Sequence, residues 1–253
     1  MSILAVIPAR LQSTRFPDKP LVPLLGVPLV RRTALRVLES GRADEVVVST
    51  DDERIAALVE DLPLEVDLDH RRYRSGSDRV AAVARRRSAE VIVNVQVDEV
   101  LVDGEMIDIA LSSLEWADIG TVSVPLRACE LTDPHVVKIA LPSSEEGRVL
   151  DFARLVGASW EHAFVTAHAG IYAFGYDVLQ RFARLSTGLR EACSHLEQLR
   201  ALDRGWPIFV GCLQRELVAV NIPEDAARAE QALAQESKRN NAQIACANAS
   251  KGP

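Results

Sequence analysis

The chain has 253 residues, a hydrophobic content of 48% and a formal net charge of −7 at neutral pH. This length allows one α/β domain with room for a subdomain, and a mean hydropathy of +0.04 is typical of a globular protein. The acidic balance argues against a nucleic-acid-binding protein, and the longest apolar runs are too short to cross a membrane. The apolar run begins directly after Met1-Ser2, so we expect no signal peptide and a cytoplasmic location.

The first twenty residues join a short apolar run to a cationic loop. Residues 3–7 are all apolar and stop at Pro8, which predicts a buried strand of a parallel sheet. Arg10, Arg15 and Lys19 follow in the next loop. Ligands of parallel α/β sheets bind beyond the carboxyl ends of the strands, and guanidinium groups bind phosphate oxygens. The loop therefore favours a phosphate site over a solvated basic segment, although it has neither a Walker A nor a glycine-rich dinucleotide pattern.

Strands and helices alternate as far as about residue 125. We expect strands at 45–50, 64–68, 91–95 and 119–125, and helices at 28–40, 52–60, 75–87 and 104–114. This order predicts right-handed connections in a mainly parallel sheet.

From about residue 127 the pattern changes to strands without long helices between them. These strands are expected at 136–141, 147–152 and 169–174, which predicts an inserted antiparallel layer. Later helices are expected at 176–183, 193–204 and 223–237, and later strands at 207–212 and 217–220. We therefore expect a single domain over residues 1–238, with an inserted region at about 127–190 and a disordered tail at 239–253.

Eight short motifs occur in a characteristic order. The first is the cationic loop, Pro8-Ala9-Arg10-x-x-Ser13-Thr14-Arg15-x-Pro17-x-Lys19-Pro20-Leu21. The others are Thr50-Asp51-Asp52-Glu53-Arg54-Ile55, Ser75-Gly76-Ser77-Asp78-Arg79, Asn94-Val95-Gln96-x-Asp98-Glu99, Val136-Val137-Lys138, His168-x-Gly170-Ile171-Tyr172, Leu196-Glu197-Gln198-Leu199-Arg200 and Pro223-Glu224-Asp225. In this order, from residue 3 to about residue 235, they resemble the CMP-KDO synthetases (3-deoxy-manno-octulosonate cytidylyltransferases).

This resemblance implies a Rossmann-like nucleotidyltransferase fold, with a mainly parallel central sheet and an inserted antiparallel subdomain that forms a homodimer. It implies transfer of CMP from CTP to an acidic acceptor, a KDO-like sugar acid, with release of pyrophosphate and with Mg²⁺ as cofactor. The catalytic residues that it implies are Arg10, Arg15, Lys19 and Asp98.

The resemblance also divides the site residues between the two substrates. The CTP-binding set is Ala9, Arg10, Ser13, Arg15, Lys19, Ser75, Gly76 and Gln96. The acceptor-binding set is Gln96, Arg154, His168, Tyr172, Glu197 and Gln198. The metal ligands are Asp98 and the residue at the family's second aspartate position, which is Asn221 here.

The residues themselves leave simpler alternatives open. Asp98 and Glu99 follow an expected strand and suit Mg²⁺, which binds one or two carboxylates plus substrate phosphates, but a loop or capping acid fits this position equally well. Ser75 is expected to cap a helix in any case, and Glu197 on a helix is otherwise a solvated residue. Of the five histidines, only His168 falls within a motif. The four cysteines lack zinc-type spacing, which agrees with reduced thiols.

The chain departs from the family pattern mainly on the metal and acceptor sides. Val97 and Val100 replace a glycine and a proline beside Asp98, and Asn221 offers an uncharged amide oxygen in place of a carboxylate. The cationic loop departs only at Asp18, where the family has glycine.

On the acceptor side, Ala167 and Ala169 replace an arginine and an isoleucine, and residues 155–159 lack the family's Pro-Ile-Pro-Tyr run.

These departures leave two other functions open. One is CMP transfer to a small, more highly charged acid such as the phosphonate phosphonoformate, in natural-product biosynthesis. The other is a non-catalytic nucleotide-binding relative. Neither involves a nucleic acid or a membrane as partner.

Overall fold

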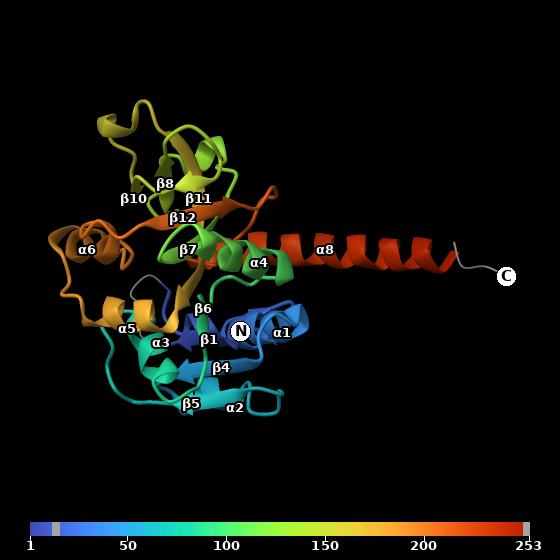
Figure 1. Cartoon of the computed structure of the whole chain (residues 1–253). Helices are drawn as coiled ribbons and strands as arrows, with labels where there is room; N and C mark the ends of the chain where they lie inside the picture. The colour runs from blue at the N-terminus through green and yellow to red at the C-terminus, as the bar shows by residue number, and fades with distance from the viewer. Residues whose placement is uncertain (12–15, 250–253) are drawn as a thin grey trace.

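A ten-stranded mixed sheet forms the centre of the computed structural model, which describes residues 1–11 and 16–249, with the backbone alone for 240–249 (Figure 1). The strands are β1 (Ile3–Ala9), β2 (Pro23–Leu24), β3 (Val27–Pro28), β4 (Glu45–Thr50), β5 (Glu65–Leu68), β6 (Val91–Val95), β7 (Ile119–Val124), β8 (Lys138–Leu141), β9 (Gly147–Arg148), β10 (Asp151–Ala153), β11 (Phe164–Gly175) and β12 (Ile208–Cys212). The helices are α1 (Leu29–Ser40), α2 (Glu53–Ala57), α3 (Gly76–Ala84), α4 (Gly104–Ser112), α5 (Tyr176–Arg184), α6 (Leu189–Ser194), α7 (Leu199–Leu202) and α8 (Pro223–Ala249).

The strand order is β5-β4-β1-β6-β11-β7-β12-β9. Strands β5, β4, β1 and β6 are parallel to one another, as the alternation of strands and helices predicts. Strand β11 runs antiparallel between β6 and β7, and its first half also pairs with β8, which pairs with β10. The mainly parallel sheet and the antiparallel addition confirm the predicted fold class.

Helices cover both faces of the sheet. Helices α1 and α4 pack on one face, where Val30, Ala34 and Ile107 join a hydrophobic cluster with residues of β1 and β4. Helices α3 and α5 pack on the other face, where Val80 and Phe182 belong to a second cluster. The wholly apolar sequence of β1 follows from this arrangement, because the strand is covered on both sides.

Local capping explains several helix boundaries. Asp52, Ser75 and Asp103 accept hydrogen bonds from backbone N–H groups of the first turns of α2, α3 and α4. Helix α1 ends at Gly41, whose φ of 62° is a left-handed conformation that costs glycine little.

Four expected elements differ most from the structure in their extent or type. The helix expected at 193–204 is two helices, α6 and α7, because His195 adopts a left-handed conformation with φ 53° and ends α6. The strand expected at 147–152 is divided into β9 and β10, and residues 217–220 form an irregular segment instead of a strand.

The fourth correction concerns the C-terminal segment. Helix α8 continues to Ala249 instead of ending near Ser237, so the tail expected to be disordered from Arg239 is helical over most of its length. The first part of α8 packs on the domain through Ala229 and Leu233, and the second part projects away from it (Figure 1). None of the helices described is long and apolar enough to cross a membrane.

Candidate active site

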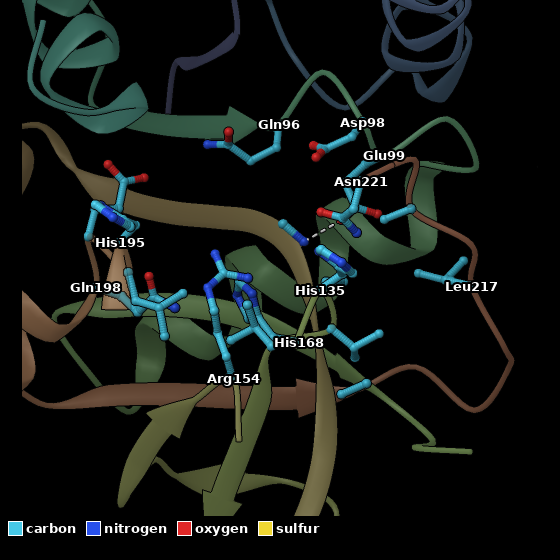
Figure 2. A pocket seen from close by; sticks show the side chains of 18 of the residues that line it. Gln96, Asp98, Glu99, His135, Arg154, His168, His195, Gln198, Leu217 and Asn221 are labelled. Atoms are coloured by element: carbon cyan, nitrogen blue, oxygen red, sulfur yellow. Dashed lines mark hydrogen bonds between the residues drawn. The ribbon is translucent and has the colours of Figure 1, made fainter. Parts of the chain in front are cut away.

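A cavity of about 870 Å³ opens beyond the carboxyl ends of β1 and β6 (Figure 2). Most of the residues expected at the site line it: Arg10, Ser75, Gly76, Gln96, Asp98, Arg154, His168, Tyr172, Glu197, Gln198 and Asn221. The structure therefore brings the expected acceptor set and part of the expected CTP set to one place. Ala9 is buried at the end of β1 and does not line the cavity, while Ser13 and Arg15 lie outside the described residues.

Lys19 reaches the site through an ion pair. Its Nζ lies 2.7 Å from Oδ2 of Asp98, and both side chains are largely buried. The preceding residue, Asp18, has a left-handed backbone with φ 53°. This conformation explains why a glycine suits the position, and aspartate is one of the few other residues that tolerate it.

A bulge in β11 packs against the end of β6. The register of β11 against β7 shifts between Ala169 and Tyr172, and within this shift Gly170 accepts a hydrogen bond from the backbone of Gln96 at 2.9 Å. The N–H of Gly170 donates to Oε1 of Glu99 at 2.6 Å. Burial and the neighbouring carboxylate of Asp98 raise the pKa of Glu99 to about 7. Glu99 therefore holds the backbone of Gly170 in place at the base of the cavity.

A hydrogen-bond chain connects the two sides of the cavity. Gln96 Nε2 donates to Asn94 Oδ1 at 3.2 Å, and Asn94 Nδ2 donates to the hydroxyl of Ser77 at 3.1 Å. That hydroxyl donates to Glu197 at 2.9 Å, and the N–H of Ser77 donates to the same carboxylate at 3.0 Å. Glu197 is therefore a cap of helix α3 and is not simply solvated. A Cβ at the position of Gly76 would lie 3.1 Å from Gln96 Nε2, so a larger residue there would displace the amide of Gln96.

His168 is held as a neutral imidazole. Its Nε2 lies 2.9 Å from the hydroxyl of Thr121, which itself donates to the carbonyl of Ile171 at 2.7 Å. The hydroxyl has only one proton, so Nε2 must carry the ring proton and Nδ1 is the acceptor. Burial lowers the pKa of His168 to about 3, and burial also raises the pKa of its neighbour Tyr172. Both side chains therefore act as neutral hydrogen-bonding groups.

Arg154 lies at the other end of the cavity, where a buried lysine holds its backbone. Lys138 is fully buried and donates to the carbonyls of Asp133, Val136 and Arg154, the last at 2.7 Å. Burial lowers the pKa of Lys138. This lysine accounts for the Val136-Val137-Lys138 motif as a support for this end of the cavity, because it ties strand β8 to the loop before it and to Arg154.

Asp98 and Asn221 are suitable ligands for a divalent ion. Both line the cavity, and the N–H of Val220 donates to the backbone carbonyl of Asp98 at 3.2 Å, which brings their segments together. Among the described residues there is no group of three His, Cys, Asp or Glu side chains that would enclose a metal. One carboxylate and one amide oxygen fit an ion such as Mg²⁺, which keeps substrate phosphates and water as its other ligands.

The two valines of the metal motif do not obstruct the site. Val97 and Val100 are 7% and 0% exposed and belong to the core cluster beneath the cavity. The carbonyl of Val97 accepts a hydrogen bond from Thr33 of helix α1 at 2.7 Å. Of the departures around the metal motif, only Asn221 therefore changes the chemistry of the cavity.

The structure adds two residues that the sequence did not indicate. His135 and His195 both line the cavity, although neither falls within a motif. Each lies in a loop whose position depends on contacts between distant segments, so no local pattern could have identified it. Asn94 belongs to a motif, but its position as the central member of the hydrogen-bond chain is evident only from the structure.

Known proteins resemble this chain over most of its length. Residues 4–210 match the family model described as cytidylyltransferase. A curated 3-deoxy-manno-octulosonate cytidylyltransferase from Syntrophobacter fumaroxidans is 38% identical over 94% of this chain and 99% of its own length. The enzyme of the same name from Geobacter metallireducens is 37% identical over 89% of this chain and 95% of its own length.

A solved structure is also similar to this chain. CMP:2-keto-3-deoxy-manno-octonic acid synthetase complexed with CTP superposes with a TM-score of 0.81 and 28% identity, over 93% of this chain and 100% of that one. Nucleotidyltransferases of this family generally use a divalent metal. The chain is therefore a CTP-dependent nucleotidyltransferase and belongs to the cytidylyltransferase family, with the 3-deoxy-manno-octulosonate cytidylyltransferases as its relatives.

Proposed function

We propose that the protein transfers CMP from CTP to 3-deoxy-manno-octulosonate, or to a closely similar sugar acid, with Mg²⁺ as the divalent ion. The observation that carries this proposal is the placement of the Lys19–Asp98 pair and of Arg154 in reach of one cavity. Phosphate-binding and acid-binding groups therefore face a common space, as a transfer between a triphosphate and an acid requires.

On the nucleotide side, Arg10 and Lys19 supply cations to the triphosphate, together with Arg15 of the same motif. Charge builds on the phosphoryl oxygens as the acceptor hydroxyl attacks the α-phosphorus and the bond to pyrophosphate breaks, and these cations stabilise that charge. Gly76 would allow the chain to approach the nucleotide closely, and Gln96, which lines the cavity beside it, would contact both substrates. Asp98 and Asn221 would hold Mg²⁺, which when bound neutralises charge on the phosphates.

On the acceptor side, Arg154 pairs with the carboxylate of the acid. His168 accepts a hydrogen bond from an acceptor hydroxyl at Nδ1, because its Nε2 is already engaged with Thr121. Tyr172, Glu197 and Gln198 complete the proposed acceptor set. The test is pyrophosphate release with Mg²⁺ and CTP across a panel of sugar acids, with ATP, GTP and UTP as controls.

A second candidate acceptor is a small phosphonate. Asn221 places a neutral amide in the cavity where the family has a carboxylate, so the cavity repels a dianionic acid less. Pyrophosphate release with phosphonoformate but not with the sugar acids would support this candidate. No release with any acid, despite CTP binding, would instead support a non-catalytic nucleotide-binding protein.

We also propose a homodimer and a cytoplasmic location. The resemblance of the motifs to those of the family supports the dimer. The free thiols of Cys129, Cys193 and Cys212 agree with a reducing compartment and support the location. Size-exclusion chromatography with light scattering tests the first, and fractionation of the source cells tests the second.

A further inference from the structure

Arg154 connects two loops that each carry a histidine to the cavity. Its Nε donates to the carbonyl of Ser194 at 3.0 Å, and its Nη1 donates to the carbonyl of Pro134 at 3.1 Å. The residues that follow these carbonyls are His195 and His135, and both line the cavity with Arg154 (Figure 2). The arginine therefore fixes the backbone beside each histidine.

Neither histidine side chain has a structural partner in the part of the chain whose side chains are described. Within residues 1–11 and 16–239, no hydrogen bond, ion pair or ring contact engages either imidazole. His195 is exposed and His135 is half-buried, so both remain accessible from the cavity. Neither ring is needed to hold its loop, which leaves its donors and acceptors for a ligand.

The acidic side chains near these histidines are engaged elsewhere. Glu191 binds the buried guanidinium of Arg200, and Glu130 binds Arg127. Glu197 accepts its two hydrogen bonds from Ser77. These three carboxylates are therefore already neutralised or hydrogen-bonded, and that of Asp133 accepts the backbone N–H of His135 at 2.8 Å, which leaves the two imidazoles to meet an incoming acid.

The backbone of His195 supports a role for its side chain. Its φ of 53° and ψ of 43° are a left-handed conformation, which glycine adopts at much lower cost. Only three non-glycine residues in the described part of the chain have a positive φ, and another of them is Asp18 of the cationic loop. Strained positions of this kind concentrate at functional sites.

We propose that His135 and His195 bind the acceptor acid on either side of Arg154, so that three basic side chains recognise its oxygen atoms. This inference rests on the proposed function. Imidazole N–H groups donate to carboxylate and hydroxyl oxygens, and hydrogen bonds to charged groups are the strong ones. The acceptor class is thus an acid with further oxygen substituents near the carboxylate.

Steady-state kinetics with 3-deoxy-manno-octulosonate test the proposal. His135→Ala and His195→Gly remove the imidazoles, and the glycine keeps the left-handed backbone without strain. We expect each variant to raise the KM for the acid about tenfold and to change the KM for CTP by less than about twofold. His162→Ala is the matched control, because His162 is exposed and does not line the cavity. Unchanged KM values for the acid in both variants would overturn the proposal.

A second measurement separates this inference from the proposed function. Acylation of histidines by diethyl pyrocarbonate, followed by mass spectrometry, reports accessibility without turnover. We expect 3-deoxy-manno-octulosonate to protect His135 and His195, and to leave His162 equally reactive. Equal acylation of His135 and His195 with and without the acid would overturn the inference even where pyrophosphate release occurs. Protection without turnover would support the inference and contradict the proposed function.

Discussion

Lys19 and Asp98 form an ion pair of 2.7 Å across 79 positions of sequence, with 13% and 19% of their side chains exposed. The ammonium is the proposed ligand of the triphosphate, and the carboxylate is the proposed ligand of the metal. The pair would therefore couple the two halves of the proposed nucleotide site, because each group would exchange its partner when CTP and a divalent ion bind.

Lys19→Met is expected to strengthen the binding of Mn²⁺ measured without nucleotide. The lysine competes with the ion for Asp98, and a partly buried pair worth about 1 kcal/mol corresponds to about a fivefold change in the dissociation constant. Electron paramagnetic resonance of free Mn²⁺ measures this constant. Lys238→Met is the control, because Lys238 is exposed on α8. Equal Mn²⁺ affinity in the Lys19 variant and the wild type would contradict the competition.

Asn221→Asp is expected to lower the Mg²⁺ concentration for half-maximal pyrophosphate release by about tenfold, because a second carboxylate joins Asp98. The backbone at this position stays fixed, since the N–H of Asn221 donates to Asp225 at 2.9 Å.

The Mg²⁺ dependence of initial rates measures this change, with Asn221→Ser as the uncharged control. A half-maximal concentration equal to that of the wild type would show that residue 221 is not a metal ligand. A rise in the KM of a phosphonate in the same variant would favour the dianionic acceptor.

His168 is expected to make stability fall in acid. Its folded pKa of about 3 lies below the ordinary 6.5, so only the unfolded chain takes up a proton between these values. The contribution of His168 to the free energy of unfolding is therefore present above pH 6.5. It is lost as the pH falls towards 3, by about 1.4 kcal/mol per pH unit.

Urea unfolding of the wild type and of His168→Gln at pH 7.5 and pH 4.5 measures the effect. At the lower pH the wild type should lose about 3 kcal/mol more than the variant, over the two units below 6.5. Equal losses in the two proteins would show that His168 takes up a proton readily in the folded state.

Gly76→Ala is expected to lower kcat/KM for CTP by about tenfold, since crowding of a packed site typically costs about 1–2 kcal/mol. The added Cβ would lie 3.1 Å from Gln96 Nε2 and would strain the hydrogen bond of that amide to Asn94. Gly157→Ala is the control, because its Cβ would meet nothing closer than 3.9 Å. Equal kinetics of the two variants would remove Gln96 from the nucleotide site.

Much of the fold follows from local sequence. Residues 45–50 and 91–95 are strands with the bounds that their apolar runs predict. The edge of the sheet at which the cavity opens also follows from the order of strands and helices. The short helix α2 is an exception, because it ends at Ala57 although apolar residues continue beyond it. Such boundaries depend on packing more than on periodicity.

The sequence by itself determined the family, the cationic loop and the positions of Asp98 and His168, because these depend on residue types at short spacing. Tertiary structure alone decided the pairing of Lys19 with Asp98, the neutral state of His168 and the presence of His135 and His195 in the cavity. The physical reason is that ion pairs, buried tautomers and loop positions arise from contacts between segments far apart in the chain, and a local pattern carries no information about those contacts.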